Sequence, residues 1–590
     1  MGLNPFVLGR DLTALDGGRR FDLIVVGGGI TGISLAREAA ARGLRTALFE
    51  RDDFGSGTSA ATTKYIHGGI RYLEQYDIGV VRESLRERRI LALGAPHLVE
   101  QTRFIMPAWR WSKPPTALIG AGVVLYDVLA FDRNRQAPSS LQIPHPRWMS
   151  RRQLLEAVPW LDPEGLQGAF AYHDTLNVHP ERLLLAYAKS AAAAGALLFN
   201  HVEVDGFIVE SSDSRGGHDH AVGGVTYVDR LSGRRGEVTA SVVVNAAGPW
   251  IDRVLAMLGF STGVRVARSK GVHVLTRPLG GIGRVHDAVF ARARSGRHVI
   301  VSPWMGRSFI GPTDTPMDED GDRVMVEAED VDLILETVNS TMSAGEKPLT
   351  TDDVELTTVG VRPLVQREET AGSSRSTYEA SRAHEFHHHA DRGVANLWSI
   401  GGGKWTTARA TAEQMVDRLL ESELSMLPSR AASTRRIAVA GAFAWAEDAE
   451  PFLTAVEHDM SSVPADVARH IARLYGTEWR IVADLIAGDP TLAARIGQRS
   501  LDIGAQVVMA VVHEGARTLS DIVDRRLVLG TIGMVTESEL QRVAAIAGPL
   551  LGWDRETEVA QVRVESIRRE AIDARWRKGI PVGDSTVGAL

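Results

Sequence analysis

The chain has 590 residues, a net charge of −7 and no cysteine. This length exceeds what one hydrophobic core supports, so two or three domains are expected. The absence of cysteine excludes disulfides, thiolate metal sites and cysteine nucleophiles, and it favours an intracellular, cytoplasmic enzyme. The acidic balance gives no indication of nucleic-acid binding, and residues 1–20 lack the apolar core of a secretory signal.

The first predicted element is a βαβ unit over residues 21–50. An apolar strand, glycines spaced G-x-G-x-x-G, a helix and a second strand ending on Glu50 follow one another. This order indicates a dinucleotide site, with a pyrophosphate at the helix N-terminus and Glu50 on the ribose hydroxyls. The stretch alone does not decide between FAD and NAD. The residues predicted to hold the cofactor here are Gly27, Gly28, Gly29, Ile30, Thr31, Gly32, Glu50 and Arg51.

A loop of small and hydroxyl residues over 55–64 comes next, and it suits contacts with a polar cofactor. It leads to paired glycines beside His, Arg and Tyr in the segment 67–72. Such glycines let backbone pass close to a ligand, and Arg71 supplies a cation for an anion. A solvated loop is the alternative. Residues 77–95 then have the pattern of an amphipathic helix.

The most membrane-like stretch is Ala117 to Phe131. It is too short to span a bilayer and contains Asp127. A core helix is therefore favoured over an interfacial one, although a peripheral membrane contact stays open.

Several segments after residue 165 combine strands with ligand-like turns. A helix is predicted from Pro180 to residue 194, and strands over 199–209 and 222–227. The segment 241–250 runs from an apolar strand into a turn at Gly248, the kind of strand end at which ligands bind. Residues 268–275 place Lys270 and His273 around a glycine, residues 299–315 are predicted to form two strands around a turn, and VGVRPL at 359–364 holds Arg362 before a proline.

A second glycine-rich turn joins a strand to a helix over residues 397–409. The helix is expected to begin near Trp405 or Thr406 and to direct its N-terminus at a site beside Lys404. The histidines 387–389 are expected in an exposed loop, because adjacent histidines rarely share one metal, and no metal site is predicted. Residues 430 to about 560 have helical spacing without such turns, which indicates a separate domain.

These segments together resemble the FAD-dependent glycerol-3-phosphate dehydrogenases that pass electrons to a quinone. The matching motifs occur in the family's order between residues 21 and 420, and the helical tail with RTLSDIVDRR at 517–526 is also similar. The most specific are IHGGIRYLE at 66–74 and GGKWTTAR at 402–409; the others are NAAGPW, SKGVH, SPWM, IGPTDT and GVRPL.

The resemblance implies an α/β Rossmann-like FAD-binding domain, an α+β substrate-binding domain and a C-terminal all-α domain. The expected division is 20–103 with 166–260 and 385–425 for FAD, 104–165 with 261–384 for substrate, 430–565 for the helical domain and 566–590 for a tail. A homodimer is compatible with this arrangement.

Site residues follow from the same resemblance, position by position. Further FAD contacts are implied for Thr58, Ser59, Lys64, His67, Gly68, Gly69, Val204, Ala247, Gly248, Trp250, Gly403, Lys404, Trp405 and Thr406. The substrate side is implied to consist of Arg71, Tyr72, His273, Arg362, Arg375 and Lys404, because several cations suit a phosphate dianion. The catalytic roles are implied for His273, Arg362 and Lys404: His273 is expected to take the hydroxyl proton and Arg362 to polarise the oxyanion. A purely structural His273 is the alternative.

Three departures from the family pattern bear on the substrate contacts. His179, Pro180 and Glu181 stand where the family has an acidic pair, Ser376 replaces an aspartate, and Trp405 replaces a leucine.

The implied reaction oxidises glycerol 3-phosphate to dihydroxyacetone phosphate with a quinone as acceptor, at the cytoplasmic membrane as a peripheral protein. One alternative is an oxidase of the same substrate that uses oxygen. Others are an FAD enzyme for a carboxylate-bearing amino or hydroxy acid, and a flavin-binding scaffold without turnover.

Overall fold

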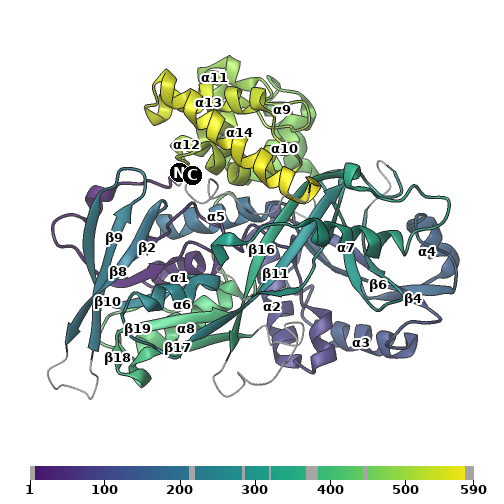
Figure 1. Ribbon diagram of the computed structural model, residues 1–590, viewed down its shortest axis with the longest axis horizontal. Helices are drawn as coiled ribbons and strands as arrows, with labels where there is room; N and C mark the ends of the chain where they lie inside the picture. The colour runs from purple at the N-terminus through teal and green to yellow at the C-terminus, as the bar shows by residue number, and fades with distance from the viewer. Residues whose placement is uncertain are drawn as a thin grey trace.

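The computed structural model describes residues 7–211, 220–281, 286–317, 321–366, 383–442 and 449–578. Two β-sheets lie side by side, and a group of helices from the C-terminal part of the chain covers them from one end (Figure 1).

The first sheet contains the dinucleotide unit. Its strands β7, β2, β1, β10 and β19 are parallel neighbours in that order, β17 closes one edge antiparallel to β19, and a β8–β9 hairpin extends β10. The bounds are β1 Arg20–Val26, β2 Thr46–Phe49, β7 Leu197–Phe199, β8 Val202–Ser211, β9 His220–Asp229, β10 Arg235–Asn245, β17 His384–His388, β18 Val394–Ala395 and β19 Leu397–Gly402.

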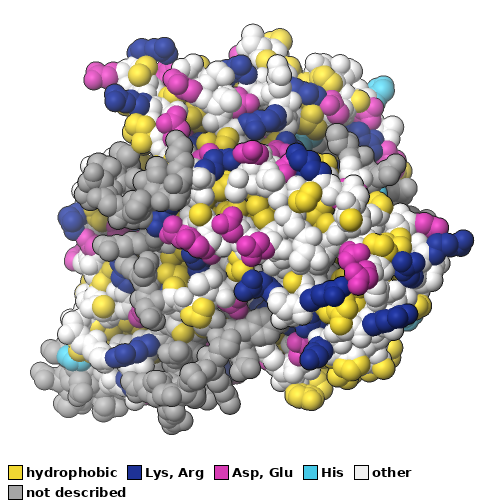
Figure 2. Space-filling view, turned by 45° about the vertical axis from the view of Figure 1, so that its right-hand side comes forward, with side chains coloured by type: hydrophobic (Ala, Val, Ile, Leu, Met, Phe, Trp, Pro, Cys, Tyr) yellow, Lys and Arg dark blue, Asp and Glu magenta, His cyan; other side chains and the backbone are white. Residues whose placement is uncertain are grey.

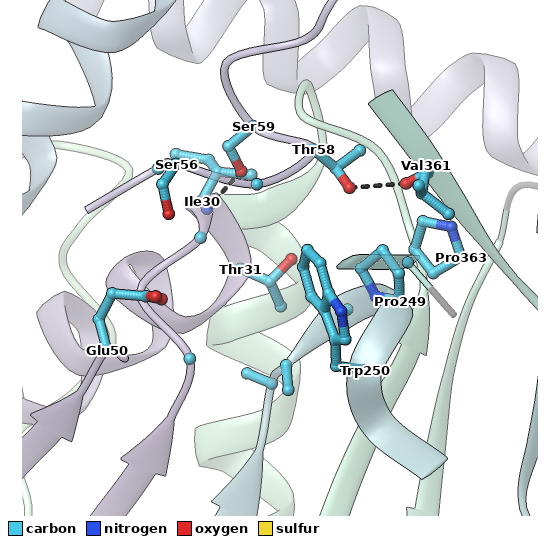
Figure 3. Close-up of a pocket in the computed structure, with 18 of the residues that line it drawn as sticks. Ile30, Thr31, Glu50, Ser56, Thr58, Ser59, Pro249, Trp250, Val361 and Pro363 are labelled. Carbon is cyan, nitrogen blue, oxygen red and sulfur yellow. Dashed lines mark hydrogen bonds between the residues drawn. The ribbon is translucent and has the colours of Figure 1, made fainter. Parts of the chain in front are cut away.

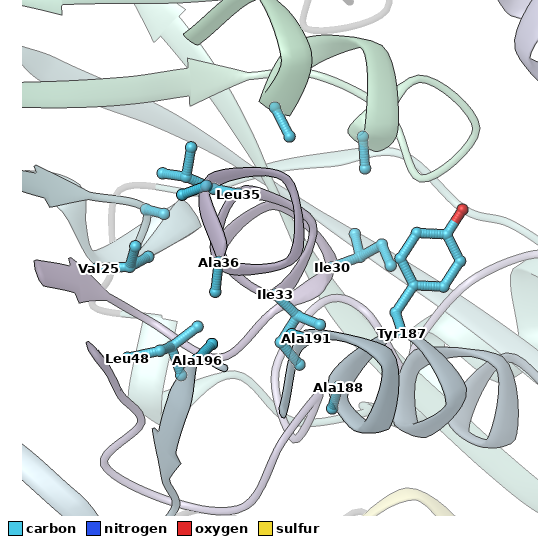
Figure 4. Close-up of a cluster of buried hydrophobic side chains, with 14 of the residues drawn as sticks. Val25, Ile30, Ile33, Leu35, Ala36, Leu48, Tyr187, Ala188, Ala191 and Ala196 are labelled. Atoms are coloured by element: carbon cyan, nitrogen blue, oxygen red, sulfur yellow. The ribbon is translucent and has the colours of Figure 1, made fainter. Parts of the chain in front are cut away.

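Helix α1 (Ile30–Ala41) packs against this sheet, with α5 (Pro180–Ala193) and α8 (Ala408–Glu421) against α1 in turn. Figure 4 shows Ile33 of α1 facing Ala188 and Ala191 of α5. Small side chains at this contact let the two helices approach closely, so the start of α1 is held rigidly at the end of β1.

The second sheet builds the other half of the molecule. Its order is β15-β11-β14-β13-β12-β4-β6-β3, with β16 beside β11 and β5 beside β6. The bounds are β3 Tyr65–Ile66, β4 Val99–Trp109, β5 Arg147–Ser150, β6 Leu166–Asn177, β11 Arg265–Thr276, β12 Asp287–Arg292, β13 His298–Trp304, β14 Arg307–Gly311, β15 Thr315–Met317 and β16 Val354–Gln366.

The pairing of β6 corrects the predicted domain division. Residues 166–177 were assigned to the FAD-binding domain, but β6 pairs with β4 over its whole length. Strand β3, also assigned to the first domain, pairs with the end of β6. The boundaries fail because long-range strand pairing decides sheet membership, and a local pattern does not carry that information.

The remaining helices of the two-sheet body lie around its edges. They are α2 (Ile78–Gly94), α3 (Thr116–Leu129), α4 (Arg151–Ala157), α6 (Ile251–Ala256) and α7 (Ala328–Asn339). Helix α8 begins at Ala408, two or three residues later than expected. Among the described helices, none has both the length and the apolarity that crossing a membrane requires.

Helix α3 corrects the preference for a core position. Leu118, Val128 and Phe131 are 61%, 61% and 76% exposed, while Val123 and Tyr126 on the opposite side are buried. The hydrophobic stretch thus has one face in the core and one apolar face in solvent.

The C-terminal helices form the predicted all-α domain, so the expected fold class is confirmed. They are α9 (Glu450–Asp459), α10 (Ala465–Tyr475), α11 (Trp479–Gly488), α12 (Gly504–Val512), α13 (Glu537–Leu551) and α14 (Arg555–Lys578). The predicted tail began at 566, inside α14. The helix continues there because Arg568 and Arg569 bind Asp524 and Glu565, and Trp576 is buried.

A buried ionic cluster fastens the helical domain to the first sheet. Asp53, which follows Glu50 closely, accepts hydrogen bonds from Arg525, Arg526 and the Asn200 amide. His201 and Asp521 also belong to the cluster, and the Nε2 of His201 lies 2.8 Å from a carboxylate oxygen of Asp521. The guanidinium groups neutralise its carboxylates.

The histidines at 387–389 do not form the expected exposed loop. His387 and His388 belong to β17, and the His388 ring stacks on Trp398 at 4.0 Å. His389 is buried, and its Nε2 lies 2.8 Å from the Ser399 hydroxyl. The sheet absorbs these residues because an adjacent strand, β19, supplies their packing partners.

Candidate active site

A cavity of about 440 Å³ opens at the carboxyl ends of β1, β2 and β10. Figure 3 shows Glu50 and Ser56 at one side of it, Thr31 and Ser59 near its middle, and Trp250 and Pro363 at the other. From the predicted cofactor residues the wall takes Gly27, Gly29, Ile30, Thr31, Glu50, Arg51, Thr58, Ser59, Val204, Ala247, Gly248, Trp250, Gly403, Lys404 and Trp405. The elongated lining suits a dinucleotide.

At the start of α1 the backbone approaches its neighbours so closely that only glycine fits. Gly27 has a φ of 109°, which favours glycine, and a Cβ on Gly28 would lie 2.7 Å from the Cβ of Glu50. A Cβ on Gly32 would overlap the carbonyl oxygen of Gly27. The Ser59 hydroxyl accepts a hydrogen bond from the Ile30 N–H at 2.9 Å, so the loop after Glu50 is fixed onto the helix start.

The carboxylate of Glu50 is held in position by two backbone N–H groups. Its carboxylate accepts the Gly28 N–H at 2.6 Å and the Asp52 N–H at 2.9 Å. Burial raises the pKa of Glu50 to about 7, and the backbone donors oppose that shift. The side chain therefore faces the cavity in a position to accept from hydroxyl groups, as expected for a ribose.

Gly32→Ala is expected to abolish cofactor retention. The new methyl group cannot fit against Gly27, so the helix start must move away from the pyrophosphate position, at a folding cost of about 1–3 kcal/mol. The flavin-to-protein ratio after purification measures this. Gly79→Ala is the matched control, because a Cβ there meets nothing within 4 Å; equal flavin loss in both variants would contradict the expectation.

A second cavity of about 810 Å³ adjoins the first. Four residues line both: Thr58, Pro363, Gly403 and Lys404. Ligands bound in the two cavities would meet at these residues. The second cavity also receives Arg71, Tyr72 and Arg362 from the predicted substrate residues.

Two cations near the junction are held in place by hydrogen bonds, an ion pair and a ring contact. Arg362 donates to the Thr313 carbonyl at 2.8 Å and to the Ser269 hydroxyl at 3.0 Å, and it pairs with Asp314 at 3.1 Å. The Lys404 ammonium donates to Ser84 at 2.8 Å and lies 4.0 Å from the centre of the Tyr72 ring. Fixed cations of this kind can bind an anion or stabilise a developing oxyanion.

His273 lies immediately behind the wall of the second cavity. Its ring stacks on Phe309 at 4.8 Å, and its Nε2 is 3.1 Å from the hydroxyl of Thr63, which does line the cavity. Burial lowers the pKa of His273 to about 3, and Arg362 and Lys64 add to the shift. The imidazole is therefore neutral at neutral pH.

His67 and Gly69, both predicted beside the cofactor, line the second cavity. Burial lowers the pKa of His67 to about 4, with Lys404 and Arg71 contributing. The backbone of His67 is fixed by its N–H, which donates to Thr406 at 3.3 Å.

Three other predicted cofactor residues stand behind the walls that the described residues form. Lys64 is buried, pairs with Glu181 at 3.3 Å and lies over the Trp304 ring. Gly68 donates its N–H to the Tyr126 hydroxyl, and Thr406 binds His67. The Lys64 ammonium is held by Glu181, which stands at one of the departures from the family pattern. Arg375 lies outside the described residues.

Arg292 and His298 are among the residues of the second cavity that sequence reasoning did not predict. Both sit on strands without a glycine-rich turn, so no local motif marked them. The alternation of apolar and polar residues over 287–304 was the sequence signal that could have identified them.

Comparisons with known proteins agree on the family. The FAD dependent oxidoreductase model matches residues 22–418, and the model for the C-terminal domain of alpha-glycerophosphate oxidase matches residues 432–558. A glycerol-3-phosphate dehydrogenase of Synechocystis is 35% identical over 551 residues, which is 91% of this chain and 94% of that protein. Glycerol-3-phosphate dehydrogenase 2 of Mycobacterium tuberculosis is 33% identical over 93% of this chain and 89% of its own.

A solved structure extends the agreement to the fold. The glycerol-3-phosphate dehydrogenase of Bacillus halodurans, complexed with FAD, superposes with a TM-score of 0.73 at 27% identity. The match covers 97% of this chain and 98% of that one, so both sheets and the helical domain are included.

Proposed function

The chain belongs to the FAD-dependent glycerol-3-phosphate dehydrogenases, and we propose that it oxidises sn-glycerol 3-phosphate to dihydroxyacetone phosphate. FAD is the cofactor, and when bound it supplies the acceptor for the C2 hydride. The glycines at the start of α1 and the carboxylate of Glu50 fit its adenosine diphosphate part.

The observation that carries this proposal is the junction of the two cavities. Lys404 lines both cavities, and Arg362, next to the shared Pro363, lines the second cavity together with Arg71. A phosphate monoester needs several converging cations, whereas an uncharged polyol does not. The same cations could bind a carboxylate, so amino and hydroxy acids are the competing substrates.

Anaerobic bleaching of the flavin tests the proposal. Glycerol 3-phosphate should bleach the purified holoenzyme, whereas glycerol, D-amino acids and hydroxy acids should not. Bleaching by a carboxylate substrate instead would favour the related oxidoreductases, and no bleaching by any of them would favour a scaffold.

His273 is proposed as the base, with the Thr63 hydroxyl between it and the cavity. His273→Asn is expected to lower the rate of flavin reduction roughly 100- to 10,000-fold with little change in KM. Stopped-flow reduction at saturating substrate measures this. Because the pKa of His273 is about 3, the free base predominates from pH 8 to pH 5. This group should therefore cause no loss of rate in that range.

Two further variants, Thr63→Val and His67→Asn, test whether His273 or His67 is the base. Thr63→Val should slow reduction if the proton passes through its hydroxyl. His67→Asn should have a smaller effect than His273→Asn; the reverse order would assign the base to His67.

A membrane quinone is the proposed electron acceptor, and α3 is the proposed contact with the bilayer. Residues 110–152 contain seven Arg or Lys and two Asp, in a chain whose net charge is −7. Along the lower right of Figure 2, apolar side chains gather below a group of Lys and Arg side chains. An apolar helix face among cations suits a surface of anionic lipid.

Replacing Leu118, Val128 and Phe131 together with serine is expected to weaken binding to anionic vesicles about 100-fold. Each apolar side chain buried in the bilayer should contribute about 1 kcal/mol or more to the binding free energy. The loss of all three side chains therefore corresponds to about 100-fold weaker binding. Co-sedimentation with vesicles measures the affinity, and flavin reduction should be unchanged.

Val559→Ser with Ile567→Ser is the matched control, because both residues are exposed apolar positions on α14. Equal weakening by the control would refute a specific role of α3.

The electron acceptor is decided by a separate experiment. Turnover with a quinone analogue and without hydrogen peroxide supports the dehydrogenase, whereas peroxide formation in air supports the oxidase.

A further inference from the structure

Helix α5 begins with His179, Pro180 and Glu181, one of the places where the sequence departs from the family pattern. Pro180 occupies the first helical position, and the His179 ring caps the helix by accepting the Arg182 N–H at 3.3 Å. Glu181 is buried in the first turn, where the helix dipole favours a carboxylate. The segment therefore starts the helix and leaves a buried negative charge to be compensated.

The charge that compensates Glu181 is the ammonium of Lys64. The Nζ of Lys64 and the Oε1 of Glu181 are 3.3 Å apart, and the two side chains are only 4% and 5% exposed. Burial by itself raises the pKa of Glu181, but Lys64 and His179 outweigh it and bring this pKa to about 2. Glu181 is therefore ionised at neutral pH and forms a buried ion pair with Lys64.

The segment 177–181 holds Lys64 in two further ways. The Lys64 carbonyl accepts the Asn177 N–H at 2.8 Å. The Lys64 ammonium lies 4.5 Å from the centre of the Trp304 ring, and the indole N–H of Trp304 donates to the Val178 carbonyl at 3.0 Å. A backbone hydrogen bond, an aromatic ring and a carboxylate thus fix this lysine together.

Lys64 adjoins both groups that contact His273. Its φ of 62° lies in the left-handed region, which residues other than glycine rarely adopt, so the surrounding contacts must maintain this backbone. Thr63 directly precedes it, and the Thr63 hydroxyl lies 3.1 Å from the Nε2 of His273. The Lys64 ammonium is also 5.7 Å from the centre of the Phe309 ring, on which His273 stacks.

We infer that the ion pair of Lys64 with Glu181 positions the Thr63 hydroxyl against His273. Neither member of the pair belongs to the two cavity walls that the described residues form, so both act through Thr63 and are positioning residues. The inference rests on the proposed function, in which Thr63 stands between the base and the substrate. The segment that departs from the family pattern thereby sets the geometry of proton transfer.

Glu181→Gln tests the inference in the holoenzyme. Without the carboxylate, the backbone at Lys64 loses one of its holds, and the Thr63 hydroxyl moves away from His273. The rate of flavin reduction at saturating glycerol 3-phosphate should therefore fall roughly 10- to 100-fold, with little change in KM and FAD content. An unchanged rate would overturn the inference.

A double-mutant cycle with Thr63→Val separates this route from a general loss of stability. In the Thr63→Val background, Glu181→Gln should slow flavin reduction almost no further, because the hydroxyl through which it acts is already absent. A full additional loss there would overturn the inference. If Glu181→Gln does not fold, Lys64→Met combined with Glu181→Gln replaces it with the same expected rate, since this variant leaves no unpaired buried charge.

Glu478→Gln is the matched control, because Glu478 pairs at 2.6 Å with Lys189, a buried lysine on the same helix α5. It should lower the thermal stability as Glu181→Gln does and leave the rate of flavin reduction unchanged. Equal slowing by both variants would show that any damage to α5 slows the reaction, and it would overturn the inference.

If glycerol 3-phosphate fails to bleach the wild-type flavin, the proposed function fails, and the His273 ring reports the positioning by itself. Nitrogen NMR of isotopically labelled histidines measures this, with the His273 signals assigned by their absence in His273→Asn. These signals should shift in Glu181→Gln and in Thr63→Val but not in Glu478→Gln. Unchanged His273 signals in Glu181→Gln would overturn the inference independently of any activity.

Discussion

Arg362→Ala should retain FAD and lose roughly 100- to 1000-fold in kcat/KM for glycerol 3-phosphate, the loss typical of an oxyanion donor. The guanidinium is fixed by Thr313, Ser269 and Asp314 at the junction of the cavities, so it needs no reorganisation when charge develops on a substrate oxygen. Steady-state kinetics and the flavin-to-protein ratio measure the two effects. Lys404→Ala should behave similarly in kcat/KM.

Lys270→Ala is the matched control for both variants. Lys270 lies on β11 near Arg362 but pairs with Asp330 at 2.6 Å, and it is absent from the cavity walls that the described residues form. Its kinetics should be close to wild type. Loss of FAD from Arg362→Ala and Lys404→Ala would show that these cations hold the cofactor rather than the substrate.

Asp53→Ala should lower the free energy of unfolding by about 3–5 kcal/mol, because it leaves the buried guanidiniums of Arg525 and Arg526 without their shared carboxylate. Asp53 also follows Glu50 in the loop over the dinucleotide, so FAD affinity should fall together with stability. Thermal or urea unfolding of the holoenzyme, with flavin release recorded in parallel, measures both.

Asp205→Ala provides the comparison, because its partner Arg235 is 72% exposed in its side chain. Loss of an exposed pair should cost less than about 1 kcal/mol. An Asp53 variant no less stable than the Asp205 variant would show that Asp521 and solvent compensate the two arginines.

The dinucleotide unit could be predicted because its signal is local. The strand, the glycines and Glu50 lie within 30 residues, and each has a steric or electrostatic reason that the structure bears out. The helix of 78–94 and the start of α5 at Pro180 were likewise readable from spacing and capping.

The rest depends on contacts between distant segments. Strand β6 joins the second sheet through β4, about 70 residues earlier in the chain, and no local pattern reports that partner. The pairing of Lys64 with Glu181, 117 residues later in the chain, likewise has no local signal. Arg292 becomes a site residue only when β12 and β13 are paired and turned toward the cavity.

The wall shared by the two cavities ties the affinities of their ligands together. Thr58, Pro363, Gly403 and Lys404 touch both spaces, so the cofactor completes the enclosure that the substrate enters. By thermodynamic reciprocity, whatever factor FAD contributes to substrate affinity, the substrate returns to FAD. A substrate that binds more tightly to the FAD-loaded enzyme would therefore also strengthen the binding of FAD.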